Sequence, residues 1–85
     1  MGMKQKIMIV DDAEINRQIL MAILGDKYEY VQAENGCQAV HMLQHDLTID
    51  LILLDINMPE MNGFQMLERM NKFHWIDEIP VIMIY

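Results

Sequence analysis

The sequence lacks several features that would direct it toward particular classes of protein. It contains one cysteine, Cys37, among 85 residues, so no disulfide can form within the chain. No apolar run approaches the roughly 18 to 20 residues that span a bilayer, and the N-terminus lacks the long apolar segment of a signal peptide. These absences predict a chain with no membrane span, and we expect a reducing, cytoplasmic location.

Basic residues are scarce as well. Six Lys and Arg stand against thirteen Asp and Glu, which gives a formal net charge of −7. Nucleic-acid binding needs clustered positive charge, so we expect no nucleic-acid partner for this segment. With only four glycines and two prolines, the sequence has no linker-like or low-complexity tract. What is present is an apolar fraction of 53%, and this length predicts a single domain over residues 1–85.

Short apolar runs predict strands that are buried on both faces of a parallel sheet. The first run ends in the acidic pair Asp11-Asp12, and another ends in Asp55. A less apolar segment with Tyr28, Tyr30 and Val31 also favours a strand. Strands are therefore predicted at residues 6–10, 28–33, 51–54 and 81–85.

Helical periodicity predicts a helix after each of the first three strands. In the first, residues 13–24, Ile15, Ile19 and Ile23 recur at every fourth position with Arg17 between them, which is typical of an amphipathic helix with an isoleucine stripe. Gly25 is expected to end it. The later helices are predicted at residues 37–45, with Ala39, Val40 and Leu43 on one side, and at residues 64–71, with a stripe of Phe64, Leu67 and Met70.

Alternating strands and helices imply an α/β fold with parallel strands, right-handed crossovers and helices on both faces of the sheet. Ligands of such sheets bind beyond the carboxyl ends of the strands. Asp11, Asp12 and Asp55 all follow strand ends. If the first and third strands are neighbours, the three carboxylates converge.

Three carboxylates at one place raise each other's pKa and need a positive charge to offset them. Mg²⁺ accepts carboxylate, water and phosphate oxygens as ligands, and an aspartate beside such an ion can accept a phosphoryl group. The alternative is structural: Asp11 and Asp12 cap the first helix, and Asp55 merely ends a strand.

Two segments of the sequence resemble response-regulator receiver domains of the CheY-like superfamily. They are Lys6-Ile7-Met8-Ile9-Val10-Asp11-Asp12 and the segment of residues 53–64, which contains Asp55-Ile56-Asn57-Met58-Pro59. Asn35-Gly36 and Ile79-Pro80-Val81 also match the family. The resemblance implies a flavodoxin-like, doubly wound parallel sheet with strand order 2-1-3-4. It also implies that the last helix-strand-helix segment of a receiver is missing.

The resemblance also implies roles for individual residues. Asp55 would be the phosphoacceptor, with Mg²⁺ bound by Asp55, by Asp12, by the backbone carbonyl of Asn57 and, through a water, by Asp11. The implied donor is a phosphohistidine on a sensor histidine kinase or a phosphotransfer protein. The chain would then be a phosphoacceptor, not an enzyme that turns over a substrate.

The sequence departs from the family at two contacts to the phosphoryl group. Tyr85 stands where the family has Ser or Thr, and a phenol carries its hydroxyl much farther from the backbone. The family's lysine at the end of the fifth strand has no counterpart, because no lysine follows Lys72. These departures predict weak phosphorylation with little coupling to an output.

Other interpretations stay open. A chain that ends at the fourth strand would expose apolar residues there and on the first helix, so we expect a homo-oligomer. A degenerate receiver that serves only as an assembly module is the main alternative. A dehalogenase-like hydrolase is disfavoured, because its nucleophile follows the first strand in a DxDx[TV] pattern. His41 and His45 could share a helix face and bind a metal, but surface positions explain both.

Overall fold

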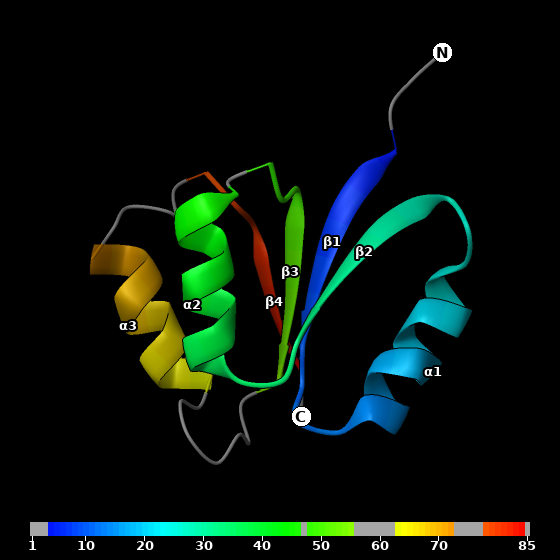
Figure 1. The fold of residues 1–85 in the computed structure, drawn as a ribbon, viewed down its shortest axis with the longest axis horizontal. Coiled ribbons are helices and arrows are strands. Elements are labelled where there is room, and N and C mark those ends of the chain that lie inside the picture. Colours follow the sequence, from blue (N-terminus) through cyan, green and yellow to red (C-terminus); the bar gives the residue numbers. More distant parts are fainter. Residues whose placement is uncertain (1–3, 47, 56–62, 73–77, 85) are drawn as a thin grey trace.

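The computed structural model describes residues 4–46, 48–55, 63–72 and 78–84. Strands and helices alternate through them, as the apolar runs and the helical periodicity predict (Figure 1). Most predicted boundaries are within one residue of the observed ones. The elements are β1 (Gln5–Val10), α1 (Glu14–Leu24), β2 (Tyr28–Ala33), α2 (Gly36–His45), β3 (Leu51–Asp55), α3 (Gly63–Lys72) and β4 (Val81–Ile84).

The four strands form one parallel sheet in the order β2-β1-β3-β4, which confirms the predicted fold class and strand order. The register places Val10 of β1 opposite both Ala33 of β2 and Leu54 of β3. The carboxyl ends of these strands are therefore level with one another. In Figure 1, α1 covers one face of the sheet, and α2 and α3 cover the other.

The core has two parts, because residues of each central strand alternate between the two faces of the sheet. Met8 and Val10 of β1 lie in the larger part, with α2 and α3, while Ile7 and Ile9 lie in the smaller part, with α1. Both central strands are buried nearly throughout, as their unbroken apolar runs predict. The larger part consists of Met8, Val10, Ala33, Ala39, Val40, Leu43, Ile49, Ile52, Leu54, Met66, Met70 and Ile79.

The buried sides of α2 and α3 agree with the sequence pattern where the structure describes them. Ala39, Val40 and Leu43 of α2 are buried as predicted, and so is Met70 of α3. Met66 is fully buried too, although the predicted stripe does not include it. The side chains of Phe64 and Leu67 lie outside the described part of the chain.

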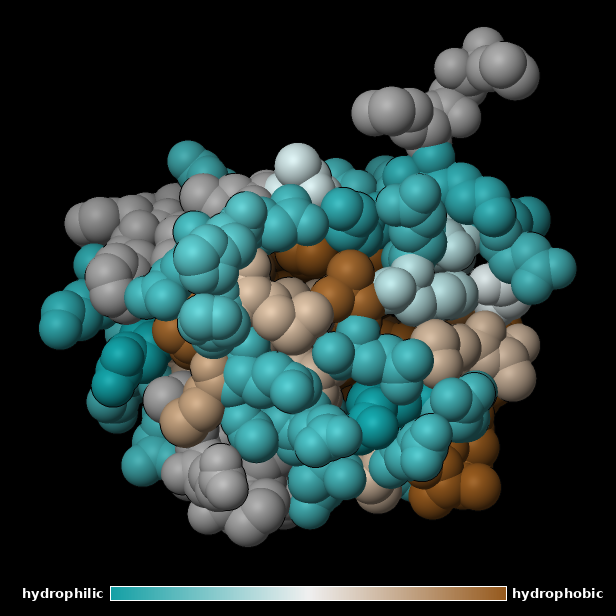
Figure 2. All heavy atoms as spheres, in the orientation of Figure 1, coloured by the Kyte–Doolittle hydropathy of each residue, from teal (hydrophilic) through white to brown (hydrophobic). Residues whose placement is uncertain are grey.

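The helix α1 forms where it is predicted, but the predicted apolar stripe is wrong. Ile15, Ile19 and Ile23 are 68%, 50% and 74% exposed, whereas Arg17, expected on the polar side, is buried. Figure 2 shows a strongly hydrophobic area over α1, at the lower right of the view. The residues of α1 that pack against Ile7, Ile9 and Leu53 of the sheet are Leu20, Met21 and Leu24.

The end of α1 follows the local chemistry of glycine. Gly25 has φ of 85° and ψ of −163°, a conformation that disfavours a side chain, and its N–H donates to the carbonyl of Met21. The hydroxyl of Tyr30 donates to the Gly25 carbonyl at 2.6 Å. This bond joins the turn to β2. Among the described helices, none has the length and apolar character of a membrane span.

Candidate metal centre

Asp11 directly follows β1 and is fixed through its main chain and its side chain. Its N–H donates to the carbonyl of Ala33 at 3.1 Å, which extends the pairing of β1 with β2 by one bond. Its Oδ1 accepts the N–H of Ala13 at 2.9 Å, so the carboxylate also shapes the loop that leads into α1. Asp11 is only 4% exposed, which is unusual for an aspartate.

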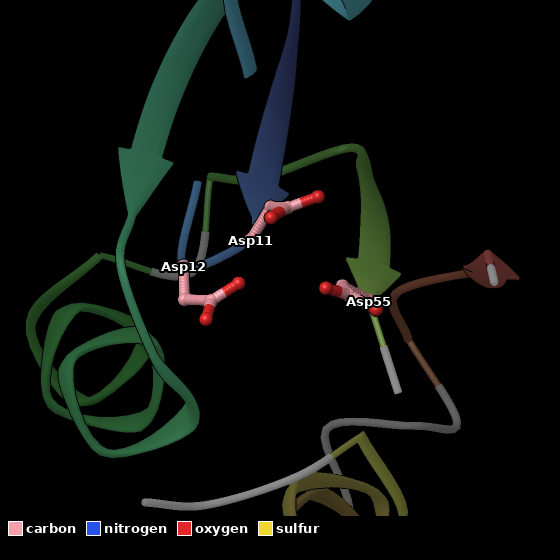
Figure 3. A group of neighbouring side chains, drawn as sticks. All are labelled: Asp11, Asp12 and Asp55. Carbon is pink, nitrogen blue, oxygen red and sulfur yellow. The ribbon is translucent and has the colours of Figure 1, made fainter. Parts of the chain in front are cut away.

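Asp55 is the last residue of β3, the strand beside β1, and it is 8% exposed. Asp12 is exposed and lies in the β1–α1 loop. One carboxylate oxygen from each of Asp11, Asp12 and Asp55 lies within 4.8 Å of the other two. In Figure 3 the carboxyl groups of Asp12 and Asp55 point toward each other across the space beyond the strand ends. The predicted convergence of the three carboxylates is therefore confirmed.

This arrangement is electrostatically unfavourable for a carboxylate without a cation. Burial raises the pKa of Asp11 above its usual 3.8, and the charges of Asp55 and Asp12 raise it further. Hydrogen bonds from the Ala13 backbone and the Asn16 side chain act in the opposite direction. Because the net effect is a raised pKa, the ionised form of Asp11 is less favourable in the folded protein than in the unfolded chain.

The three oxygens suit a small, hard cation. Magnesium takes oxygen ligands at about 2.0 to 2.1 Å in octahedral geometry, so opposite ligands stand about 4.2 Å apart. The three carboxylate oxygens, within 4.8 Å of one another, lie close to this upper limit of the separation between two ligands of one ion. The donor set contains only carboxylates, and it contains no thiolate or imidazole that would favour zinc or copper. The residues therefore fit Mg²⁺.

Asp11 and Asp12 do not act as side-chain N-caps of α1, which was the structural alternative for the acidic pair. The N-cap of α1 is Ala13, and no side chain makes the capping hydrogen bond there. Asp11 accepts the N–H of Ala13 itself, before the first turn of the helix. An N-cap does occur at α2, where Asn35 accepts the N–H of Gln38 at 2.7 Å.

Arg17 lies next to the site. The sequence pattern places it on the polar side of α1, so it was not predicted as a residue of the site. The side chain is 6% exposed. Its Nη1 donates to the backbone carbonyl of Asp11 at 2.6 Å, and its Nε donates to Oε1 of Gln32 on β2 at 2.9 Å. The only sequence feature that points to Arg17 is its place five residues after the acidic pair Asp11-Asp12. The sequence does not distinguish it from an arginine exposed to solvent.

Asn57 and Tyr85 fall outside the described residues. His41 and His45 are both exposed on α2, with ring centroids 4.9 Å apart, and they belong to no group of three metal-ligating side chains in the described part of the chain. Cys37 is exposed.

Comparison with known proteins identifies relatives for almost the whole chain. The family model of the response regulator receiver domain matches residues 7–84. A two-component response regulator of rice, ORR3, is 32% identical over 79 residues, which cover 92% of this chain and 60% of the rice protein. The chemotaxis protein CheY1 of Helicobacter pylori is 36% identical over 81 residues, with 93% of this chain and 65% of that protein covered. The chain thus spans about 60% of the rice relative's length.

Solved structures agree with this relationship. The chemotaxis response regulator CheY4 of Vibrio cholerae superposes with a TM-score of 0.85 at 30% identity, covering 95% of this chain and 68% of that one. The receiver domain of Saccharomyces cerevisiae Ssk1, solved with the histidine phosphotransfer signalling protein Ypd1, gives a TM-score of 0.78 at 28% identity, with coverage of 94% and 61%. The described fold is shared with both proteins.

Proposed function

The chain belongs to the response regulator receiver domain family, and from this premise we propose that Asp55 accepts a phosphoryl group in two-component signalling. The observation that carries the proposal is the meeting of three carboxylate oxygens within 4.8 Å at the ends of β1 and β3. Asp55 is the acceptor because it ends the strand that carries the family's phosphorylation motif. The domain spans residues 1–85 in this proposal.

In the proposed reaction a carboxylate oxygen of Asp55 forms a bond to the phosphorus of a phosphohistidine. The N–P bond of the donor breaks, and its electron pair stays on the imidazole, which takes a proton from water. Asp11 and Asp12 contribute carboxylate oxygens to the site, and the pairing of Val10 with Leu54 brings the end of β1 level with Asp55. Asp12, Asp55, the Asn57 carbonyl and, through water, Asp11 would hold a Mg²⁺, and the ion would supply charge neutralisation for the transferred group.

The donor in this proposal is a sensor histidine kinase or a histidine phosphotransfer protein. The similarity to the Ssk1 receiver, whose structure contains Ypd1, supports a partner of that class. The chain contributes positioning and charge, while the partner contributes the reactive phosphoramidate. The domain is therefore a phosphoacceptor and not a turnover enzyme. A cytoplasmic location is part of the proposal and fits the single cysteine.

The test is phosphorylation with a small-molecule donor. The chain is incubated with Mg²⁺ and acetyl phosphate, and the adduct is measured by intact mass. We expect a single phosphoryl adduct at low occupancy on the wild type, none on Asp55→Asn, and the wild-type level on Asp26→Asn, a matched control in the exposed turn after α1. An adduct that persists in Asp55→Asn overturns the assignment of the acceptor.

We further propose that Tyr85 limits the response to phosphorylation. It stands where the family places a short hydroxyl side chain that contacts the phosphoryl group. Tyr85→Thr should therefore lengthen the lifetime of the beryllofluoride adduct in ¹⁹F NMR spectra, and Tyr85→Phe should leave it unchanged. Equal lifetimes for wild type and Tyr85→Thr would contradict this role.

A second candidate function, assembly through a second copy of the chain, is favoured by two exposed features. Ile82 of β4 is 51% exposed, and β4 pairs only with β3 among the described strands. The isoleucines of α1 are exposed on the same side of the sheet, since Ile82 pairs with Leu53 of the α1-side core. Light scattering at micromolar concentration tests this, because Ile82→Lys should convert a dimer to a monomer.

A further inference from the structure

Arg17 is a buried charge with a defined set of partners. The sequence has two arginines, and the other, Arg69, is exposed in the last turn of α3. A buried guanidinium is costly unless its donors are satisfied. Arg17 donates to the Asp11 carbonyl and to the Gln32 side chain, and the described residues contain no buried side-chain polar atom without a partner.

These bonds close a ring around the acidic loop. Asp11 Oδ1 accepts the N–H of Ala13, and the carbonyl of Ala13 accepts the N–H groups of Asn16 at 3.1 Å and Arg17 at 3.3 Å. The side chain of Arg17 then returns to the carbonyl of Asp11. Asp12 lies in this loop, between Asp11 and Ala13, which are joined by the hydrogen bond from the Ala13 N–H to Asp11 Oδ1.

The ring is anchored to the sheet at two places. The Asp11 N–H is bonded to the carbonyl of Ala33, and the Arg17 Nε is bonded to Gln32, both of which belong to β2. The main chain on both sides of the Asp11 side chain is therefore held. The donated bonds of Arg17 go to a carbonyl and an amide, so its direct action is on the main chain.

We propose that Arg17 is a positioning residue of the metal centre, which fixes the main chain of Asp11 and thereby the carboxylates of Asp11 and Asp12. This inference rests on the proposed binding of Mg²⁺. Groups that orient metal ligands from outside the coordination sphere change metal affinity by about 10- to 100-fold when they are lost. The arrangement also explains why a charged side chain occupies the buried face of α1.

Calorimetric titration of the 85-residue chain with Mg²⁺ is the experiment. Arg17→Met, which keeps most of the apolar volume, should weaken Mg²⁺ binding about tenfold or more. Arg17→Lys keeps the charge and a single donor nitrogen and should recover part of the affinity. Gln32→Met removes only the Nε partner and should have the smaller effect. Arg69→Met removes the same charge from the end of α3 and should bind as the wild type does.

A second measurement uses the wild type alone. Because only two arginines exist, ¹⁵N spectra contain two Nε–H signals, and Arg69 is an internal reference. The Arg17 signal should exchange slowly with water and shift during Mg²⁺ titration with the same midpoint as the amide of Asp12. This measurement decides the matter if Arg17→Met does not fold.

The outcomes separate the two proposals. A wild type that binds no Mg²⁺ overturns the proposed function, and the role of Arg17 with it. A wild type that binds Mg²⁺, together with a folded Arg17→Met of affinity within twofold, overturns the role of Arg17 alone. If the chemical shift of the Arg17 Nε–H signal does not change while the wild type binds Mg²⁺, the role of Arg17 is likewise overturned.

Discussion

Asp11 follows β1 and Asp55 ends the neighbouring parallel strand β3. Burial raises the pKa of Asp11, and the charge of Asp55 raises it further. The folded state therefore binds this proton more tightly than the unfolded state does. By linkage, the contribution of Asp11 to stability falls as pH rises above about 3.8. At neutral pH the ionised carboxylate of Asp11 therefore stabilises the fold less than its protonated form does, and a bound cation should reverse this.

Asp11→Asn removes the charge and keeps an oxygen that can accept the Ala13 N–H. The metal-free variant should unfold at a higher urea concentration than the wild type at pH 7, with the difference shrinking toward pH 4. Added Mg²⁺ should stabilise the wild type more than the variant, which lacks the negative charge of the water-mediated ligand. Urea titrations at both pH values measure this. A variant less stable than the wild type at pH 7 without metal would contradict the electrostatic account.

Asp46 offers a pH prediction of opposite sign. The Thr48 hydroxyl and N–H donate to its carboxylate, Lys6 donates to it at 3.1 Å, and together they lower the pKa of Asp46 to about 2. The stability from these bonds is present above about pH 3.8 and is lost as pH falls through the folded-state pKa of about 2. Thr48→Val should raise the pKa of Asp46 toward 3.8, and Lys6→Met should raise it less.

The carboxyl ¹³C titration of Asp46 tests this order directly. Hydrogen bonds from Thr48 are the first cause of the shift, and the contribution of Lys6 follows. A larger effect of Lys6→Met than of Thr48→Val would mean that the charge of Lys6, and not the local hydrogen bonding, controls Asp46.

The exposed side of α1 predicts unequal effects of substitutions at two adjacent positions. Ile19 is 50% exposed, whereas Leu20 packs against the core of Ile7, Ile9 and Leu53. Ile19→Glu should change the free energy of unfolding of the monomer by about 0.5 kcal/mol or less, and Leu20→Glu should lower it by at least about 2 kcal/mol. Urea unfolding at low protein concentration measures both.

The same pair tests self-association. If a second copy covers the exposed isoleucines, Ile19→Glu should also weaken the dimer in sedimentation equilibrium. A loss of monomer stability in Ile19→Glu equal to that in Leu20→Glu would show that the assigned buried face of α1 is wrong.

Gly25 predicts a cost that arises from the backbone alone. A Cβ added there meets no atom within 4 Å, but the φ of 85° is unfavourable for L-residues. Gly25→Ala should therefore destabilise the chain by about 1 to 3 kcal/mol. D-alanine at this position, introduced by chemical ligation, should be at least as stable as glycine, because D-residues favour positive φ. Equal destabilisation by both alanines would point to a steric cause.

Parts of the fold were predictable because the relevant signals are local. Unbroken apolar runs predict β1 and β3, since strands covered on both faces need no polar residues. Gly25 predicts the end of α1 through its conformational freedom. The strand ends also predict the convergence of Asp11, Asp12 and Asp55 once β1 and β3 are neighbours.

The sequence by itself therefore determined the order of strands and helices and the carboxylates at the strand ends. The tertiary structure alone decided which side of α1 faces the sheet. Residues 15–24 are apolar around most of the helix, so periodicity does not distinguish Ile15, Ile19 and Ile23 from Leu20, Met21 and Leu24. Leu20, Met21 and Leu24 pack against the sheet, and in this orientation of the helix Arg17 is buried beside the acidic loop. Which side of α1 faces the sheet depends on packing between residues far apart in the sequence, and the local pattern of apolar residues does not predict it.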